Sequence, residues 1–464
     1  MKFLPRNGSR SRTAARRSAV LVAALLLLSA CSGGSTQVPD TGSTAATGSA
    51  VATPGPTETP GTPATPGPSE TPGTPPTPGP TETPGTPPTP GTPPTGTTSP
   101  TTTSTSAQGP TSFVTAAGRD FEIDGAPFRF VGVNIYDAAA TDRYSCAPDA
   151  RMSPDQLRET FRRLHDEQGV TVVRFWAYQT YTDSGRDWSG LDGVIEAARE
   201  TGIRLLPVLE DGPGYCTTSE EVLPKAQYED DTWFVDGYRK QFGSAVLSFR
   251  DYAKIVAERY RDEPVIMGWS LINEADTSKR DDQDRSVLVD FAEDMVPLIK
   301  SADPNHLLTL GTQSNGAAGA SGPDFLEVYG VDGLDFAEVH DWGYWGSDDA
   351  PMPGGNGATP PAANSAACKQ TQAQSLLGCS FALSVELDKP LLVGEAGIGR
   401  GDGAAGLQNR ADLLDAKMTA AFDAGAAGYL LWRVTSKVTD QYDILMDDGD
   451  PVLDVLSEQA DAVR

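Results

Sequence analysis

Strand-like apolar runs alternate eight times with helix-like segments between residues 130 and 432, which predicts an α/β fold, a (β/α)8 TIM barrel. Polar and charged side chains follow several of these runs, and in such barrels functional residues lie at the strand ends. About 350 residues follow a low-complexity region, enough for a barrel with extended βα loops. The expected strands are Phe130–Asn134, Val170–Phe175, Arg204–Leu209, Val265–Asn273, Leu307–Gly311, Phe336–His340, Leu391–Glu395 and Gly428–Trp432.

Residues 1–30 are predicted to be a lipoprotein signal peptide. A basic region without acidic residues precedes the apolar stretch Ala19–Leu28. This stretch is too short for a membrane-spanning helix, which needs roughly 20 residues. It ends in Leu28-Ser29-Ala30-Cys31, which resembles the lipobox of bacterial lipoproteins. We therefore expect lipidation at Cys31, and ordinary secretion with a free Cys31 is the alternative.

Residues 31–110 are predicted to be a disordered linker. They consist mainly of Thr, Pro, Gly and Ser, with copies of a twelve-residue unit beginning at Thr53, Thr65 and Thr77. This composition cannot form a packed core, and its proline content favours extended chain. A repeat domain would need a hydrophobic face, which the unit lacks. The linker is therefore expected to act as a tether.

The folded domain is predicted to occupy residues 111–464 and to open with a β-hairpin that turns at Asp124-Gly125. The first helix has recognisable start signals in Ser153-Pro154-Asp155-Gln156, namely an N-cap, a proline and a capping-box glutamine. The second helix should end at Gly202. These signals separate the helices from the strands beside them.

Charge and cysteine usage limit the partners. The net charge is −27, and it becomes −33 without the six basic residues of the signal region, so the surface would repel nucleic acid and acidic polysaccharides. Four cysteines beyond Cys31 suggest two disulfides in an exported protein. Cys368 with Cys379 and Cys146 with Cys216 is one of three possible pairings. No Cys-x-x-Cys pair occurs and there are three histidines, so a bound metal is not expected.

Two glutamates indicate the chemistry. Glu274 and Glu395 each follow an apolar strand-like run and precede small residues. Two carboxylates at one rim of a barrel are what hydrolysis of a glycosidic bond requires, and a spacing of about 5–5.5 Å corresponds to a retaining mechanism. Glu274 is expected to start protonated as the general acid, with its pKa raised by an ionised Glu395. Solvated loop glutamates are the alternative.

Other strand ends supply substrate-binding candidates. Arg174 is expected to bind Glu395 and to lower the pKa of that carboxyl. Asn273 suits a sugar hydroxyl next to the reacting carbon, and His340 can orient a carboxylate or a hydroxyl. Trp432 offers a flat apolar face to a sugar ring. Further aromatic side chains are expected to extend this platform: Trp176, Trp342 and Trp345.

The chain resembles glycoside hydrolase family five, the cellulases and β-mannanases of the retaining (β/α)8 clan. The resemblance implies that Glu274 is the acid/base, that Glu395 is the nucleophile, and that Arg174, Asn273, His340 and Trp432 bind substrate. Within the family, the residues around Arg174 and the sixth strand look most like endo-β-1,4-mannanases. The matching segments are Gly132-Val-Asn-Ile-Tyr136, Val173-Arg-Phe-Trp176, Trp269-Ser-Leu-Ile-Asn-Glu274, Asp335-Phe-Ala-Glu-Val-His340, Lys389-Pro-Leu-Leu-Val-Gly-Glu395 and Ala427-Gly-Tyr-Leu-Leu-Trp432.

Two departures from the family pattern stand out. The family has a tyrosine two residues after the histidine of the sixth strand, whereas this chain has Trp342 there and Tyr344 two residues further on. Either Tyr344 takes that role or the nucleophile lacks the contact. The loop after the third strand, Glu210–Cys216, lacks the asparagine and tryptophan expected of a mannanase.

The sequence therefore predicts a retaining β-glycosidase that hydrolyses a neutral β-1,4-linked polysaccharide, an endo-β-1,4-mannanase. Alternatives are an endo-β-1,4-glucanase, a non-catalytic sugar-binding lipoprotein and a structural wall protein. We expect an extracytoplasmic monomer, attached to the membrane only through the Cys31 lipid, or else secreted. No nucleic-acid partner is expected. No cofactor is expected either, because protein carboxylates can carry the whole displacement.

Overall fold

The predicted strands form one eight-stranded parallel sheet in the computed structural model, which describes residues 109–211, 216, 232–241, 246–313, 317–342, 360–369, 377–447 and 449–464. The strand order is β8-β7-β6-β5-β4-β11-β10-β9. These strands are β4 (Phe130–Asn134), β5 (Val172–Trp176), β6 (Arg204–Val208), β7 (Gly268–Ser270), β8 (Leu307–Thr309), β9 (Ala337–Asp341), β10 (Leu391–Ala396) and β11 (Gly428–Leu431).

Hydrogen bonds also join the two ends of this order. The backbone N–H of Asp335 donates to the carbonyl of Leu308 (2.8 Å), and the N–H of His340 donates to the carbonyl of Gln313 (2.6 Å). Segments next to β8 and β9 therefore meet, and the sheet closes on itself. The predicted (β/α)8 barrel is confirmed.

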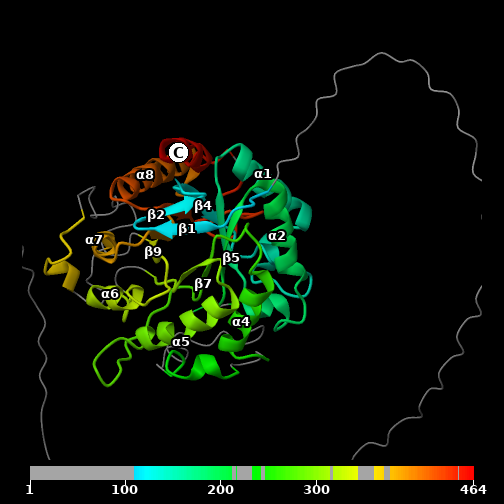
Figure 1. The fold of residues 1–464 in the computed structure, drawn as a ribbon. Coiled ribbons are helices and arrows are strands. Elements are labelled where there is room, and N and C mark those ends of the chain that lie inside the picture. The colour runs from blue at the N-terminus through cyan, green and yellow to red at the C-terminus, as the bar shows by residue number, and fades with distance from the viewer. Residues whose placement is uncertain are drawn as a thin grey trace, which may run out of the picture. The chain divides into compact units, whose positions relative to one another are not determined.

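Helices surround the strands (Figure 1). They follow the strands in alternation along the chain, as expected of parallel strands joined by crossover connections. Large apolar side chains of strands and helices pack together in the layer between them. The helices are α1 (Pro154–Asp166), α2 (Ser189–Thr201), α4 (Phe249–Tyr260), α5 (Val287–Ala302), α6 (Pro323–Tyr329), α7 (Leu377–Leu387), α8 (Gly403–Asp423) and α9 (Val452–Val463).

Local signals set the ends of the first two helices as predicted. At α1 the Ser153 hydroxyl accepts from the N–H of Gln156 (3.3 Å), and the Gln156 side chain accepts from the N–H of Ser153 (2.9 Å). This pair forms the predicted capping box. Helix α2 ends at Gly202, whose φ of 84° is a left-handed conformation that costs glycine little.

The interior of the barrel has an apolar lower part and a polar upper part. Buried apolar side chains fill the end at which the strands begin, whereas polar and charged side chains occupy the end at which they finish. This polarity places the polar groups at the carboxyl ends of the strands, where barrel enzymes bind substrate. The lower part is formed by Phe130, Val172, Leu206, Met267, Leu307, Phe336, Leu392 and Leu430.

A small N-terminal sheet packs against this apolar part. It consists of β1 (Val114–Ala117), β2 (Asp120–Ile123) and β3 (Ala126–Pro127), paired in antiparallel fashion. Asp124 and Gly125 both have positive φ at the turn between β2 and β3, as a two-residue hairpin requires. Phe121 of this sheet is fully buried in the apolar cluster. The predicted hairpin is therefore present, extended by one strand.

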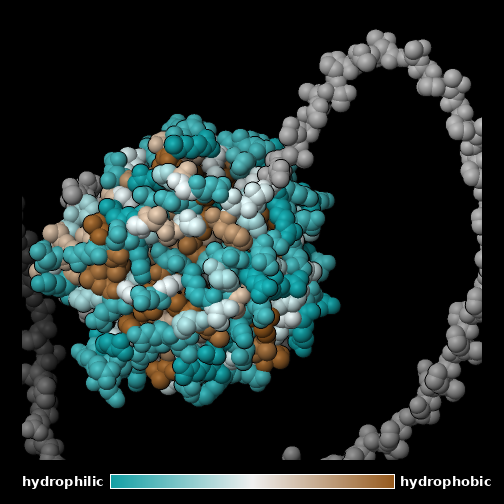
Figure 2. Space-filling model, viewed as in Figure 1, coloured by the Kyte–Doolittle hydropathy of each residue, from teal (hydrophilic) through white to brown (hydrophobic). Residues whose placement is uncertain are grey.

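On the face seen in Figure 2, hydrophilic residues cover most of the surface, and apolar residues lie between them in separate patches. Among the described helices, none is both long enough and apolar enough to cross a membrane. The predicted signal peptide, Cys31 and nearly all of the predicted linker lie outside the described residues, as do Tyr344 and Trp345.

Candidate active site

Arg174 is the centre of the polar cluster. Its guanidinium is fully buried and reaches side chains from four other segments of the barrel. One terminal nitrogen donates to Glu395 Oε1 (2.6 Å) and to Asn134 Oδ1 (3.1 Å), and the other donates to Asn273 Oδ1 (2.8 Å). Its Nε lies 3.0 Å from Glu338 Oε1. The predicted contact between Arg174 and Glu395 is therefore confirmed.

A β-bulge turns Glu395 into the barrel. In the pairing of β9 with β10, Val393 lies opposite Val339, but Glu395 lies opposite His340, so Gly394 is an extra residue. A bulge of this kind re-aims the side chain that follows it. In a regular strand Glu395 would point to the same face as Val393, because side chains two residues apart share a face.

A left-handed backbone directs Glu274. The predicted strand Val265–Asn273 is shorter than expected, because β7 ends at Ser270 and the chain then leaves the regular ladder. Glu274 has φ of 56°, a conformation that costs a residue with a side chain of order 1–3 kcal/mol. This turn allows Asn273 and Glu274 to serve the same site, although neighbouring residues of a regular strand point to opposite faces.

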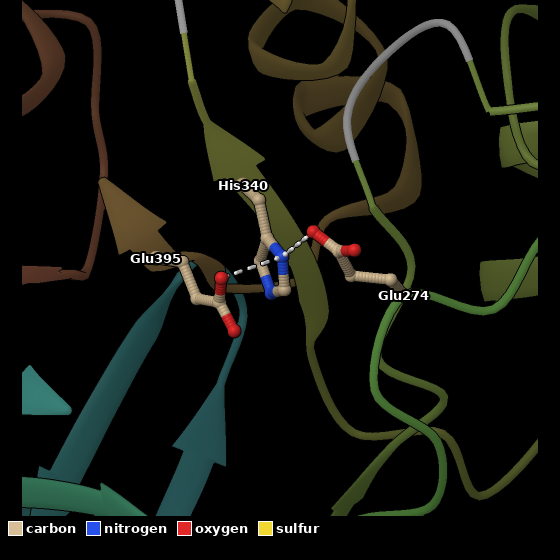
Figure 3. Close-up of side chains that lie close together, drawn as sticks. All are labelled: Glu274, His340 and Glu395. Carbon is tan, nitrogen blue, oxygen red and sulfur yellow. Dashed lines mark hydrogen bonds and ion pairs between the residues drawn. The ribbon is translucent and has the colours of Figure 1, made fainter. Parts of the chain in front are cut away.

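His340 lies between the two glutamates, as Figure 3 shows. Its Nδ1 is 2.9 Å from Glu274 Oε1 and 3.6 Å from Glu395 Oε2. One carboxylate oxygen of each glutamate and one nitrogen of His340 all lie within 4.8 Å of one another. The two carboxyl groups are therefore too close to hold a water between them as an inverting mechanism needs, since that requires about 6.5–9.5 Å.

The surroundings shift the pKa of His340. Burial lowers the pKa of the imidazole, but Glu395, Glu274 and Glu338 together outweigh burial and raise it from 6.5 to about 9. At neutral pH the ring is therefore an imidazolium. Its contribution to stability is present below pH 6.5 and is lost as the pH rises through about 9, because the folded state binds this proton more tightly than the unfolded chain.

Opposing effects act on the pKa of the Glu395 carboxyl. Burial raises the pKa of its carboxyl, and the nearby Glu274 adds to this, whereas His340 and Arg174 lower it. The net effect is a raised pKa of Glu395. Arg174 does lower this pKa, as expected, but the effect of burial is larger. Two carboxyl groups this close titrate as a pair, in which binding of the first proton is favoured. Such a pair supplies one protonated and one ionised carboxyl.

Sequence reasoning missed Glu338. This residue is fully buried in β9, two residues before His340, and its Oε2 accepts from the Ser270 hydroxyl (2.8 Å). Burial raises the pKa of Glu338, but Arg174, His340 and Ser270 outweigh burial and lower it overall, so the carboxyl is ionised. The alternation of Phe336, Glu338 and His340 on one face of the strand was the available signal.

Asp211, at the end of β6, was also missed. Its Oδ1 accepts from Asn273 Nδ2 (2.9 Å), while Asn273 Oδ1 accepts from Arg174. The backbone N–H of Asn273 donates to the carbonyl of Glu210 (2.6 Å). Both the oxygen and the nitrogen of the Asn273 amide therefore have partners, and these partners fix the orientation of the amide group.

Aromatic rings form a wall beside the glutamates. Trp432 is half-buried, stacks on Tyr136 with centroids 5.5 Å apart, and contacts Trp176 at 5.7 Å. Trp342 meets Trp432 edge-on at 6.0 Å and Tyr442 at 4.9 Å. Trp176 itself is 3% exposed, so it supports the wall from beneath. Tyr442 lies in an irregular loop, where no sequence pattern marked it.

Glu274, His340 and Glu395 are also the group of possible metal-binding side chains found in the described part of the chain. A histidine must be neutral to bind a metal. The carboxylates raise the pKa of His340 to about 9, so its protonated state fits a hydrogen bond between carboxylates better than a metal ligand.

Two disulfides link described segments outside the barrel strands. Cys146 is bonded to Cys216, with Cα atoms 5.7 Å apart, and Cys368 to Cys379, with Cα atoms 5.2 Å apart. The first pair connects the loops after β4 and β6, and this is the pairing that the sequence left open among three. Such bonds persist outside the cytoplasm, which places the barrel in an extracytoplasmic compartment.

Comparison with known proteins points to one family. Residues 226–450 match the model described as GH family 5 β-mannosidase-like. A putative mannan endo-1,4-β-mannosidase 4 of Arabidopsis thaliana is 26% identical over 404 residues, covering 75% of this chain and 90% of that protein. The mannan endo-1,4-β-mannosidase 5 of Solanum lycopersicum is 27% identical over 292 residues, covering 52% of this chain and 64% of that protein.

Solved structures share the fold. An endo-1,4-β-D-mannanase from Thermotoga petrophila aligns with a TM-score of 0.53 at 20% identity, covering 72% of this chain and all of that one. An endo-1,4-β-mannanase from Rhizomucor miehei aligns with the same TM-score and identity, covering 76% of this chain and 99% of that one. At this level of identity the likeness shows the barrel fold.

Proposed function

We infer that this chain is a glycoside hydrolase of the family 5 β-mannosidase-like group, and we propose that it is a retaining endo-β-1,4-mannanase. The single observation that carries the proposal is the pair Glu274 and Glu395, with oxygens within 4.8 Å at the carboxyl ends of the barrel strands. The relatives named above, which act on mannan by their names, support the substrate.

In the proposed reaction Glu395 attacks the anomeric carbon of the sugar while Glu274 gives its proton to the leaving glycosidic oxygen. The bond to that oxygen breaks and a covalent glycosyl–Glu395 ester forms. Glu274, now ionised, then takes a proton from water, and the resulting hydroxide attacks the anomeric carbon and releases Glu395. Two inversions give overall retention, and both carboxyl groups return to their starting states.

The remaining side chains have supporting roles in this proposal. Asn273 binds the hydroxyl beside the reacting carbon, with its amide oriented by Arg174 and Asp211. Arg174 and His340 stabilise the ionised nucleophile. The half-buried Trp432 and Trp342 offer apolar ring surface to the sugar.

A panel of soluble polysaccharides tests the substrate. The protein is incubated with galactomannan, glucomannan, carboxymethylcellulose and mixed-linkage β-glucan, and the products are read by mass spectrometry. We expect a ladder of short oligosaccharides from both mannans and little from the two glucans. Cleavage of the glucans alone would replace the proposal with an endoglucanase, and no cleavage of any glycan would favour a sugar-binding protein.

We further propose that Cys31 carries a lipid that anchors the barrel to the membrane through residues 31–110. The sequence Leu28-Ser29-Ala30-Cys31 supports this. The Cys31→Ser variant should leave the membrane fraction and keep its turnover number. A chain that begins at Thr111 should be equally active on soluble substrate, because the linker has almost no apolar surface to dock on the barrel. Membrane retention of Cys31→Ser would contradict the lipid anchor.

A further inference from the structure

Glu338 is a third carboxylate beneath the two rim glutamates. Its side chain is fully buried, so it does not reach a bound substrate. One of its oxygens lies 3.0 Å from Arg174 Nε and 3.6 Å from His340 Nε2. The other oxygen accepts from the Ser270 hydroxyl. Glu338 therefore touches both cations that contact Glu395.

The surrounding backbone is built to hold this carboxylate. A Cβ atom at Gly394 would lie 2.3 Å from Glu338 Oε1, so the bulge residue has to be a glycine for the side chain to fit. The backbone carbonyl of Glu338 accepts from the Thr312 hydroxyl (2.7 Å) and the Tyr329 hydroxyl (3.0 Å). The position of Glu338 is thus set from several elements at once.

The charges that face Glu338 and His340 come from every element packed against them. They are Arg174 on β5, Glu274 after β7, Glu395 on β10 and, as a titratable hydroxyl, Tyr329 on α6. With one proton shared by Glu274 and Glu395, two cations face two anions. If Glu338 were neutral, a net positive charge would remain in a water-poor site, which is costly.

We propose that Glu338 is a positioning residue that holds Arg174 and keeps His340 as an imidazolium between Glu274 and Glu395. The effect on the reaction passes through these two side chains, since Glu338 itself is out of reach of substrate. The kinetic part of this proposal rests on the proposed function, whereas the protonation of His340 does not.

The titration of His340 in Glu338→Gln tests the proposal. The chain contains three histidines, so selectively labelled histidine gives a small set of NMR signals, in which those of His165 and His306 serve as internal references. Removal of the negative charge should lower the pKa of His340 by about one unit or more. The signals of the other two histidines should be the same as in the wild type. This measurement needs no substrate, so it stands even if the protein fails to cleave mannan.

Kinetics on mannan give the second readout. We expect Glu338→Gln to lower kcat about tenfold, the equivalent of one pKa unit of lost charge interaction, with KM nearly unchanged. Glu338→Asp keeps the charge and should hold the pKa of His340 closer to the wild-type value than Glu338→Gln does. A variant whose kcat and His340 titration both match the wild type would overturn the proposal.

Asp341→Asn is the matched control, because it removes a buried carboxylate three residues further along the same strand. Asp341 contacts Lys417 and Tyr429, which lie outside the polar cluster of the barrel interior. It should lose stability without moving the titration of His340. If Glu338→Gln does not fold, Glu338→Asp replaces it, because the shorter side chain withdraws the carboxylate from His340 and should lower the pKa of His340 by a smaller amount. An unchanged titration of His340 in Glu338→Asp would then contradict the proposal.

Discussion

Strand β9 carries two buried charge clusters on its opposite faces. On the face toward the barrel interior, Glu338 contacts both Arg174 and His340. On the face toward the helices, Asp341 accepts from the Lys417 ammonium (3.0 Å) and the Tyr429 hydroxyl (2.7 Å). All of these side chains are buried, so burial alone does not distinguish them.

The two clusters differ in how their charges are matched. The outer one pairs one acid with one cation through directed hydrogen bonds. In the inner one, three carboxyl groups meet two cations. Arg174 Nε and His340 Nε2 both approach Glu338 Oε1 without hydrogen-bond geometry. An excess carboxyl group must share a proton. Buried ion pairs with matched charges hold the fold, and unmatched ones are suited to move protons.

The largest effect is expected at Glu395. Glu395→Ala should reduce turnover of mannan more than about a thousandfold, because the nucleophile is gone. Azide should restore part of the activity and give a glycosyl azide of inverted configuration. Activity above a few per cent of wild type without azide would show that Glu395 is not the nucleophile.

Lys417→Met probes the outer cluster. It leaves Asp341 buried without its cation, so the free energy of unfolding should fall by about 3–5 kcal/mol. The pH dependence of kcat/KM in the folded variant should stay as in wild type. Denaturant unfolding and a pH series check the two parts. A shifted pH profile would mean that the outer cluster also controls the inner one.

A smaller effect is expected for His340→Gln. Since His340 lowers the pKa of Glu395, its removal should raise that pKa further. Glu395 acts when ionised, so the acid limb of kcat/KM should move to higher pH, by about one unit. An acid limb that stays in place, or moves to lower pH, would show that His340 does not lower the pKa of the nucleophile.

The smallest effect concerns the aromatic wall. Trp432→Ala should lower kcat/KM about three- to tenfold, since one aromatic contact contributes roughly 0.5–1.5 kcal/mol. Trp188→Ala, which removes a half-buried tryptophan at the start of α2, is the control and should leave kcat/KM unaltered. Equal losses in both variants would indicate a general effect on stability, detectable by thermal unfolding.

The sequence was sufficient for the fold and for the outline of the site. The strand periodicity located the barrel, and the polar residues at or near the ends of the predicted strands included Arg174, Glu274 and Glu395. Two decisive features depend on tertiary contacts instead. The bulge at Gly394 and the left-handed φ of Glu274 are set by neighbouring strands, and no local pattern encodes them. The sequence did not mark Glu338 as a site residue, because a single acidic residue within an apolar run looks like a chance interruption of that run.

The configuration of the first product tests the central claim most directly. The hydrolysis of a mannan oligosaccharide can be followed by proton NMR during the first minutes, before the free sugar equilibrates between its anomers. The pairing of Glu274 with Glu395 at retaining distance predicts that the β-anomer appears first. Initial formation of the α-anomer would contradict the account, because it requires a water between the two carboxyl groups.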